Sequence, residues 1–80
     1  DVTIKIKVDQ SAMYMSDREL IEMAKGYFYL RGGSENGITG TGIDHNGDVS
    51  YVSIAYNHSH CYIITVDRKT GRALSMKKVF

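Results

Sequence analysis

Residues 16–33, SDRELIEMAKGYFYLRGG, decide the fold of this 80-residue chain. Ser16 and Glu19 have the types and the spacing of a capping box, in which each side chain satisfies a backbone N–H of the first helical turn. Apolar residues then recur every three or four positions, and Gly32-Gly33 supplies the left-handed residue that ends a helix. The segment predicts one amphipathic helix over residues 17–31, whose apolar stripe is Leu20, Ile21, Ala24, Tyr27 and Phe28.

The segment before the helix, residues 2–8, alternates apolar and polar side chains without a break. This period of two is that of a strand buried on one face only. The apolar face would hold Val2, Ile4, Ile6 and Val8, and the polar face Thr3, Lys5 and Lys7.

Turn-forming residues divide the rest of the chain into four further strands. Asn46-Gly47 favours a type I′ turn, because both central residues of that turn need positive φ. A second turn is expected at residues 57–59, and a third at 67–71, where Gly71 suits the left-handed position of a bulged hairpin. The strands are expected at about residues 38–44, 49–56, 60–66 and 72–79, with Leu74 and Met76 on one face of the last.

The order β-α-β-β-β-β predicts an α+β domain in which one helix packs across an antiparallel sheet. A chain of 80 residues forms a single domain, residues 1–80, and buries only about 60% of the surface that its unfolded form exposes. One face of the sheet would meet the helix and the other would stay open. We expect the excess of tyrosines, six in the chain, on that open face.

Composition and charge exclude several classes of protein. No apolar stretch approaches the roughly 18 residues that cross a bilayer, and the single cysteine, Cys61, excludes an internal disulfide framework. The net charge of +1 disfavours a nucleic-acid binder, although residues 67–80 hold five bases against one acid. The chain begins without Met, which indicates a processed or excised form, and a removed export signal would leave no trace.

Two blocks of the chain resemble the PepSY family of small, cystatin-like bacterial domains. They are residues 42–54, GIDHNGDVSYVSI, and residues 62–74, YIITVDRKTGRAL, which contain the family's strand, Val-Asp, two residues, Thr-Gly and strand. Residues 18–24 lie where the family has its helix, so the resemblance covers about residues 18–74. It implies an extracytoplasmic or secreted binding module, often linked with control of peptidases, that carries no catalytic residues. The Gln-x-Val-x-Gly loop of cystatins is missing, and inhibition of cysteine proteases is therefore not carried over.

Residues 57–61, NHSHC, form the most chemically suggestive segment. On an extended strand His58 and His60 would point to one side, as two metal ligands must, and Cys61 would point to the other. Zinc needs three or four convergent ligands, so we assign no metal ligand and prefer a polar hairpin tip with exposed histidines. Cys61 and His60 face opposite ways on a strand and cannot act as a nucleophile and its base. We predict no catalytic residue and no cofactor.

Tyrosine and methionine are residue types that protein interfaces favour. The predicted function is a non-enzymatic protein-binding module that modulates or inhibits a peptidase through its hairpin tips and its open sheet face. Two alternatives are a toxin-neutralising or phage-type interaction protein and a His-based metal binder, and a homodimer through an edge strand stays open. The predicted contact residues are Tyr14, Tyr51, Tyr56, Asn57, His58, His60, Arg68 and Lys69.

Overall fold

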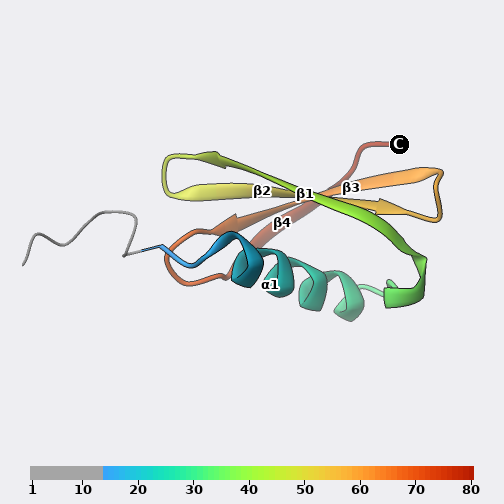
Figure 1. Cartoon of the computed structure of the whole chain (residues 1–80), viewed down its shortest axis with the longest axis horizontal. Coiled ribbons are helices and arrows are strands. Elements are labelled where there is room, and N and C mark those ends of the chain that lie inside the picture. Colours follow the sequence, from blue (N-terminus) through green and yellow to red (C-terminus); the bar gives the residue numbers. More distant parts are fainter. Residues whose placement is uncertain (1–13) are drawn as a thin grey trace, which may run out of the picture.

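The computed structural model describes residues 14–80, and these form a helical layer against one sheet (Figure 1). The strands pair antiparallel with their sequence neighbours in the order β1-β2-β3-β4. The predicted α+β class is confirmed, while the strand predicted at residues 2–8 lies outside the described residues. The elements are helix α1 (Asp17–Leu30), 3₁₀ helix η2 (Glu35–Gly37), and strands β1 (Ile38–Asn46), β2 (Val49–Tyr56), β3 (His60–Asp67) and β4 (Ala73–Lys78).

Helix α1 begins at the capping box that the sequence predicts. The Ser16 hydroxyl accepts the backbone N–H of Glu19 at 3.2 Å, and the Glu19 carboxylate accepts the backbone N–H of Ser16 at 3.2 Å. After the last turn, Gly32 has a φ of 97°, a conformation that glycine adopts without strain. The predicted helix is confirmed, and it ends one residue earlier than expected, at Leu30.

The core lies between α1 and the two central strands. Leu20, Ala24 and Phe28 are the buried residues of the helix. They repeat at a spacing of four and so form one stripe along it. The stripe packs against alternate residues of β2 and β3, namely Val52, Ile54, Ile64 and Val66, each of which is fully buried.

Two of the tyrosines that were expected on the open face lie on the helix side of the sheet, partly buried against this core. The Phe28 ring packs against Tyr56, with 5.1 Å between ring centroids, and against Tyr62, with 5.2 Å. Tyr56 shares the helix-facing side of β2 with Val52 and Ile54, because alternate residues of a strand share a face. Among the strand residues of the described sheet, only Tyr51 places its tyrosine ring on the outer face, where it is 37% exposed.

The turn between β1 and β2 differs from the prediction by one residue. Asn46 pairs with Val49, so the central residues are Gly47 and Asp48, and Gly47 has a φ of 60°. A glycine with positive φ at the first central position is the mark of a type II′ turn. The type I′ prediction is wrong, because that turn needs positive φ at both central residues, whereas Asn46 is a paired strand residue and only Gly47 of this turn has positive φ.

Strand β4 contains a bulge that the sequence analysis missed. Val66 pairs with Ala73 and Thr65 pairs with Ser75, which leaves Leu74 as an extra residue. Leu74 is 51% exposed, whereas Met76 packs against the core. The prediction that Leu74 and Met76 share one face is therefore wrong, because an extra residue breaks the alternation of side chains.

Replacing Ser16 with alanine removes the side-chain acceptor of the capping box. We expect Ser16→Ala to lower the free energy of unfolding by about 1 kcal/mol, the usual effect of losing such a cap. Ser34→Ala is the matched control, because Ser34 precedes η2 and makes no side-chain cap bond. Urea unfolding followed by circular dichroism measures both, and equal stability of the two variants would contradict the role of the cap.

Candidate functional site

The outer face of the sheet carries a shallow hollow that opens to solvent. Gly40 and Gly42 of β1 lack side chains, and small residues of β2 and β3 lie beside them. The hollow has a volume of about 300 Å³ and is lined by Gly40, Thr41, Gly42, Ser53, Ala55 and Cys61. Nothing among residues 14–80 covers this face, because α1 packs against the other one.

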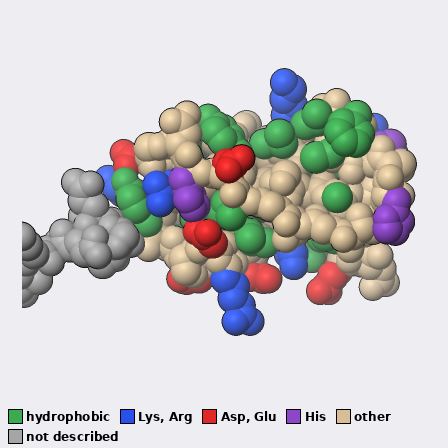
Figure 2. Space-filling model, turned by 45° about the horizontal axis from the view of Figure 1, so that its top comes forward, with side chains coloured by type: hydrophobic (Ala, Val, Ile, Leu, Met, Phe, Trp, Pro, Cys, Tyr) green, Lys and Arg blue, Asp and Glu red, His purple; other side chains and the backbone are tan. Residues whose placement is uncertain are grey.

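Apolar side chains border the hollow at one end. The backbone N–H of Val79 donates to the Cys61 carbonyl at 2.8 Å, which places the end of the described chain beside the hollow. Val79 is 45% exposed and Phe80 is 68% exposed. Figure 2, an oblique view of this face, shows hydrophobic side chains gathered toward the end that carries two histidines.

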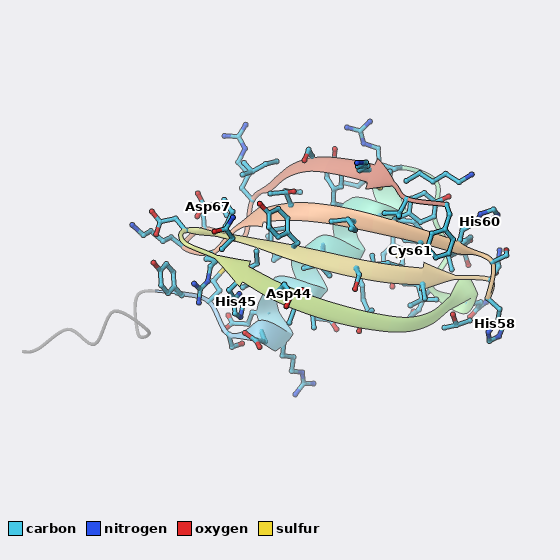
Figure 3. All side chains as sticks on the ribbon, turned by 90° about the horizontal axis from the view of Figure 1, so that it is seen from above. Asp44, His45, His58, His60, Cys61 and Asp67 are labelled. Atoms are coloured by element: carbon cyan, nitrogen blue, oxygen red, sulfur yellow. The ribbon has the colours of Figure 1, made fainter. Side chains whose placement is uncertain are left out.

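The predicted contact residues divide between the two ends of the sheet and do not form one continuous surface. Tyr14, Arg68 and Lys69 lie at the end that holds the β1–β2 and β3–β4 turns. Asn57, His58 and His60 lie at the opposite end, in and after the β2–β3 turn (Figure 3). Tyr56 lies at that opposite end too, and Tyr51 stands on the outer face.

The histidine end does not assemble the pair of ligands that extended geometry would give. Asn57 and His58 have φ values of 53° and 60°, so His58 lies in a tight turn and the alternation of a strand does not apply. His60 Nδ1 lies 3.3 Å from the Phe80 carbonyl oxygen, and Figure 3 shows His58 and His60 at different corners of this end. Within residues 14–80, no three His, Cys, Asp or Glu side chains come close enough to hold a metal ion.

Tyr56 is a structural residue in this arrangement. Its ring packs on Phe28, and its hydroxyl oxygen accepts the backbone N–H of Ser34 at 3.2 Å. A Cβ added at Gly37 would overlap the Tyr56 ring. The side chain is thus held by the connection between α1 and β1, and its role as a contact residue stays a prediction.

At the other end, which we call the two-turn end, Arg68 joins three segments of the chain. Its Nη1 donates to the Gly47 carbonyl at 2.8 Å, and its backbone N–H donates to the Asp48 carbonyl at 2.9 Å. Its own carbonyl accepts the backbone N–H of Met15 at 2.8 Å, and its guanidinium carbon stands 4.0 Å from the centre of the Tyr14 ring. The two-turn end, defined as Tyr14 with residues 46–48 and 67–71, is therefore held together by hydrogen bonds and a cation–π contact.

The β3–β4 turn within this end is shaped by one carboxylate. Asp67 Oδ1 accepts the backbone N–H groups of Lys69 and Thr70 at 2.8 and 3.2 Å. Gly71 has a φ of 75°, in the left-handed region that the sequence predicts for it. The turn prediction at residues 67–71 is confirmed, and the Lys69 ammonium group lies 3.9 Å from Asp48 Oδ2 across the two turns.

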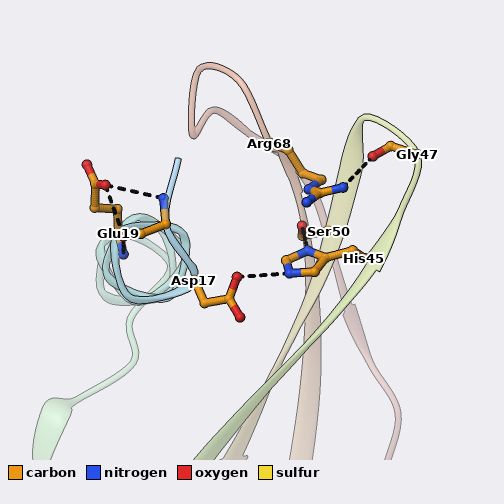
Figure 4. Close-up of polar contacts among 7 residues, drawn as sticks. Asp17, Glu19, His45, Gly47, Ser50 and Arg68 are labelled. Atoms are coloured by element: carbon orange, nitrogen blue, oxygen red, sulfur yellow. Dashed lines mark hydrogen bonds and ion pairs between the residues drawn. The ribbon is translucent and has the colours of Figure 1, made fainter. Parts of the chain in front are cut away.

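A Ser–His–Asp arrangement that the sequence analysis missed lies beside the two-turn end (Figure 4). His45 Nδ1 is 2.6 Å from Ser50 Oγ, and His45 Nε2 is 2.9 Å from Asp17 Oδ1. A carboxylate only accepts, so in the neutral imidazole Nε2 carries the proton and Nδ1 accepts from the Ser50 hydroxyl. His45 and Ser50 face each other across the β1–β2 hairpin. A sequence prediction that centred the turn on Gly47 and Asp48 would have predicted this pair.

This arrangement has the residue types of a hydrolase triad but lacks an accessible nucleophile. Ser50 is fully buried, so its Oγ cannot reach the carbonyl of a substrate. Asp17 is the first residue of α1, and His45 lies on β1. The hydrogen bonds therefore attach the start of the helix to the edge of the sheet and satisfy a buried hydroxyl.

A serine-reactive phosphonate probe tests whether Ser50 Oγ is inaccessible to reagents in the folded protein. We expect no adduct on Ser50 in the folded protein, because Oγ must reach the phosphorus atom in order to form the phosphonate ester and displace the leaving group of the reagent. Intact-mass spectrometry after prolonged incubation measures the adduct, with a serine hydrolase as the positive control. An adduct that maps to Ser50 and disappears in His45→Ala would overturn the structural role.

The Tyr14 hydroxyl gives a second measurable consequence of the two-turn end. It donates to Asp48 Oδ1 at 2.7 Å, and this hydrogen bond to the carboxylate raises the pKa of Tyr14 above its ordinary value of 10.0. The bond stabilises the folded chain fully below that value, and the stabilisation is lost as the pH rises through the folded-state pKa. An NMR titration of labelled tyrosines should show a lower pKa for Tyr14 in Asp48→Asn and no change in Asp44→Asn. Equal values of the Tyr14 pKa in all three proteins would contradict the contact.

The fold and the site were also compared with known proteins. No protein family model, no curated protein and no solved structure matches the chain. The resemblance to the PepSY family over residues 18–74 therefore stays a prediction. Within residues 14–80, no helix has the length and the apolar character that crossing a membrane requires.

Proposed function

We propose that the chain is a non-enzymatic protein-binding module that uses the outer face of its sheet and the turns at the ends of that face. The observation that carries the proposal is the outer face itself, which no element among residues 14–80 covers. It presents a hollow of about 300 Å³ bordered by the half-exposed Val79 and by Cys61. A sheet face of small residues lets a partner approach the backbone closely.

The dimensions of the hollow favour a protein over a small molecule. Pockets for small ligands have volumes of about 300–1,000 Å³ and enclose most of the ligand. The hollow has the smallest of these volumes and is open along one side, so it suits one side chain of a larger partner.

The outer face of the sheet is too small to form a stable interface by itself, so the turns must contribute to the contact area. Eight residues at about 3.3 Å rise, across four strands about 4.8 Å apart, give a footprint of roughly 500 Å². Each partner of a stable complex buries roughly 800 Å². A partner that covers the outer face must therefore also contact a turn at one end.

The two-turn end is the better of the two ends for this contact. Arginine and tyrosine are over-represented among residues that dominate binding energy, and Arg68 already stacks on the Tyr14 ring. Because the surrounding hydrogen bonds fix these side chains before binding, little conformational entropy is lost when a partner arrives. Lys69, which is exposed beside them, adds a positive charge at the rim.

The resemblance to the PepSY family makes a peptidase the first class of partner to test, and modulation or inhibition the first activity. The buried Ser50 supports a role without catalysis of its own. A toxin-neutralising or phage-type interaction protein would use the same surface, and the identity of the partner separates the two. The separation of His58 and His60 gives the His-based metal binder no support.

A substitution on the outer face tests the proposal. Ser53 lines the hollow, and Ser53→Arg would fill it with a long charged side chain. Ser34→Arg is the matched control, because Ser34 is exposed on the connection that follows α1, away from the outer face. The native chain and both variants are immobilised, and the proteins recovered from extracts of the source organism are quantified by mass spectrometry.

We expect one protein to be recovered equally by the native chain and by Ser34→Arg, and at least tenfold less by Ser53→Arg. If that protein is a peptidase, its activity should change when an equimolar amount of the chain is added. Recovery that is the same for all three chains would remove the outer face as the binding surface. Recovery of a toxin in place of a peptidase would favour the alternative partner class.

A further inference from the structure

An apolar groove separates α1 from the start of β4, on the side of the sheet that faces the helix. Its volume is about 280 Å³, and its helical wall is formed by Met23, Gly26, Tyr27 and Leu30. Met23 is 44% exposed and Leu30 is 87% exposed, so apolar side chains border the groove without being covered by the described residues. A Cβ added at Gly26 would meet no atom within 4 Å among the described residues, so the groove has room for further side chains.

The other wall of this groove is formed by Gly71 and Arg72 of the β3–β4 turn and by Ala73, the first residue of β4. Strand β4 is an edge of the described sheet. The backbone groups of β4 that do not bond to β3 therefore have no strand beside them among residues 14–80. An edge strand next to exposed apolar surface is a template for one more strand. The groove and the edge together define a site for an extended segment with one apolar face.

The chain contains such a segment, and it joins the described residues beside the site. Residues 2–8 alternate apolar and polar side chains, as a strand buried on one face does. The chain enters the described part at Tyr14 and Met15, and the Met15 N–H bonds to the Arg68 carbonyl. A Cβ added at Gly71 would lie 2.6 Å from Met15 Sδ, so Met15 adjoins the turn from which β4 begins.

The direction of the chain selects β4 over the other edge, β1. A segment that folds back along the sheet and ends at Tyr14 runs toward the two-turn end. Strand β4 starts at that end and runs away from it, whereas β1 runs toward it. The segment would be antiparallel to β4 and parallel to β1, and antiparallel pairs are slightly the more stable. The five connecting residues, 9–13, reach up to about 17 Å.

We propose that residues 2–8 add to the sheet of their own chain as a strand antiparallel to β4. Val2, Ile4, Ile6 and Val8 then fill the α1–β4 groove and cover Met23 and Leu30. The polar side chains of the segment lie on the outer face, in line with Ser75 and Lys77. The sheet gains a fifth strand, and its exposed edge at β4 is replaced by one that carries lysines, a common protection against further pairing.

Burial and charge favour a register of the segment on β4 that keeps an inward residue at Met76 and no lysine opposite Lys77. Met76 packs toward the core, so an inward residue of the segment must lie opposite it. With Ile4 opposite Met76, Lys5 faces Ser75 and Thr3 faces Lys77. A shift of two residues that puts Val2 beyond Lys78 would place Lys5 opposite Lys77, and like charges directly opposite are destabilising.

The same segment of a second copy could add to the same edge, and chain connectivity disfavours that exchange. A short flexible connection gives the attached segment an effective concentration in the millimolar range. At micromolar protein the segment of the same chain therefore occupies its own groove first.

A disulfide across the proposed pair tests the register and the edge in the full chain. In a Cys61→Ser background, Lys5→Cys is combined with Ser75→Cys on β4 or with Asp44→Cys on β1, which lies on the same face at the opposite edge. Directly opposite residues of antiparallel strands have Cα atoms about 4.5–5.5 Å apart, within the range that a disulfide spans. Oxidised glutathione accepts the two electrons and two protons of the thiols as the bond forms.

We expect Lys5→Cys and Ser75→Cys to form a disulfide within single chains, at a yield at least tenfold above that of the control pair. Non-reducing gels and peptide mass spectrometry measure the two yields. Bonds between two chains would show strand exchange and would overturn docking within one chain. Equal yields for the two pairs would overturn the choice of β4.

Hydrogen exchange gives an answer that does not depend on new cysteines. Ile4→Asp places a charge on the apolar face of the segment, and Thr3→Asp makes the same change of charge on its polar face. Amide groups of β4 that do not bond to β3 should exchange at least tenfold faster in Ile4→Asp and at the native rate in Thr3→Asp. Native exchange of these amides in both variants would overturn the proposal.

Discussion

The helix is narrower than the sheet it must cover, and the rest of the structure depends on this mismatch. An α-helix with its side chains is about 10 Å across, whereas four strands make a sheet roughly 19 Å wide. Helix α1 therefore buries the inner side chains of β2 and β3, and within residues 14–80 these two strands supply all of the fully buried apolar residues of the sheet. The inward side chains of the edge strands β1 and β4 must therefore be covered by contacts other than the centre of the helix.

The two edges solve this problem differently, because α1 runs obliquely beneath the sheet (Figure 3). Its first residue, Asp17, forms a hydrogen bond with His45 of β1, and His45 forms a second one with Ser50. These bonds attach the helix to the β1 side of the sheet. Its later turns leave Met23 and Leu30 exposed beside β4. Polar contacts complete one side, and the other side is left with exposed apolar side chains.

Most of the fold was predicted from patterns among residues that are close in sequence. The capping box, the stripe of apolar residues and the alternation in β2 depend on near neighbours, and the structure has all three. The turn at Gly47 and the bulge at Leu74 depend on the register between strands, which the packing of inward residues decides. The contact of Asp17 with His45 joins residues 28 positions apart and leaves no local pattern. The sequence could have predicted that the contact residues divide between two ends, because successive turns of antiparallel strands lie at opposite ends of a sheet.

The neighbour-to-neighbour order of the strands has a consequence for how the chain folds. Loops of two, three and five residues join β1 to β2, β2 to β3 and β3 to β4. Closing short loops loses little chain entropy, and proteins whose contacts are local in sequence fold fast for their size. The contacts from Tyr14 and Met15 to Arg68 join residues more than fifty positions apart, and they need a β3–β4 turn that is already formed. We expect the sheet to assemble by successive hairpins and the start of the helix to lock onto it last.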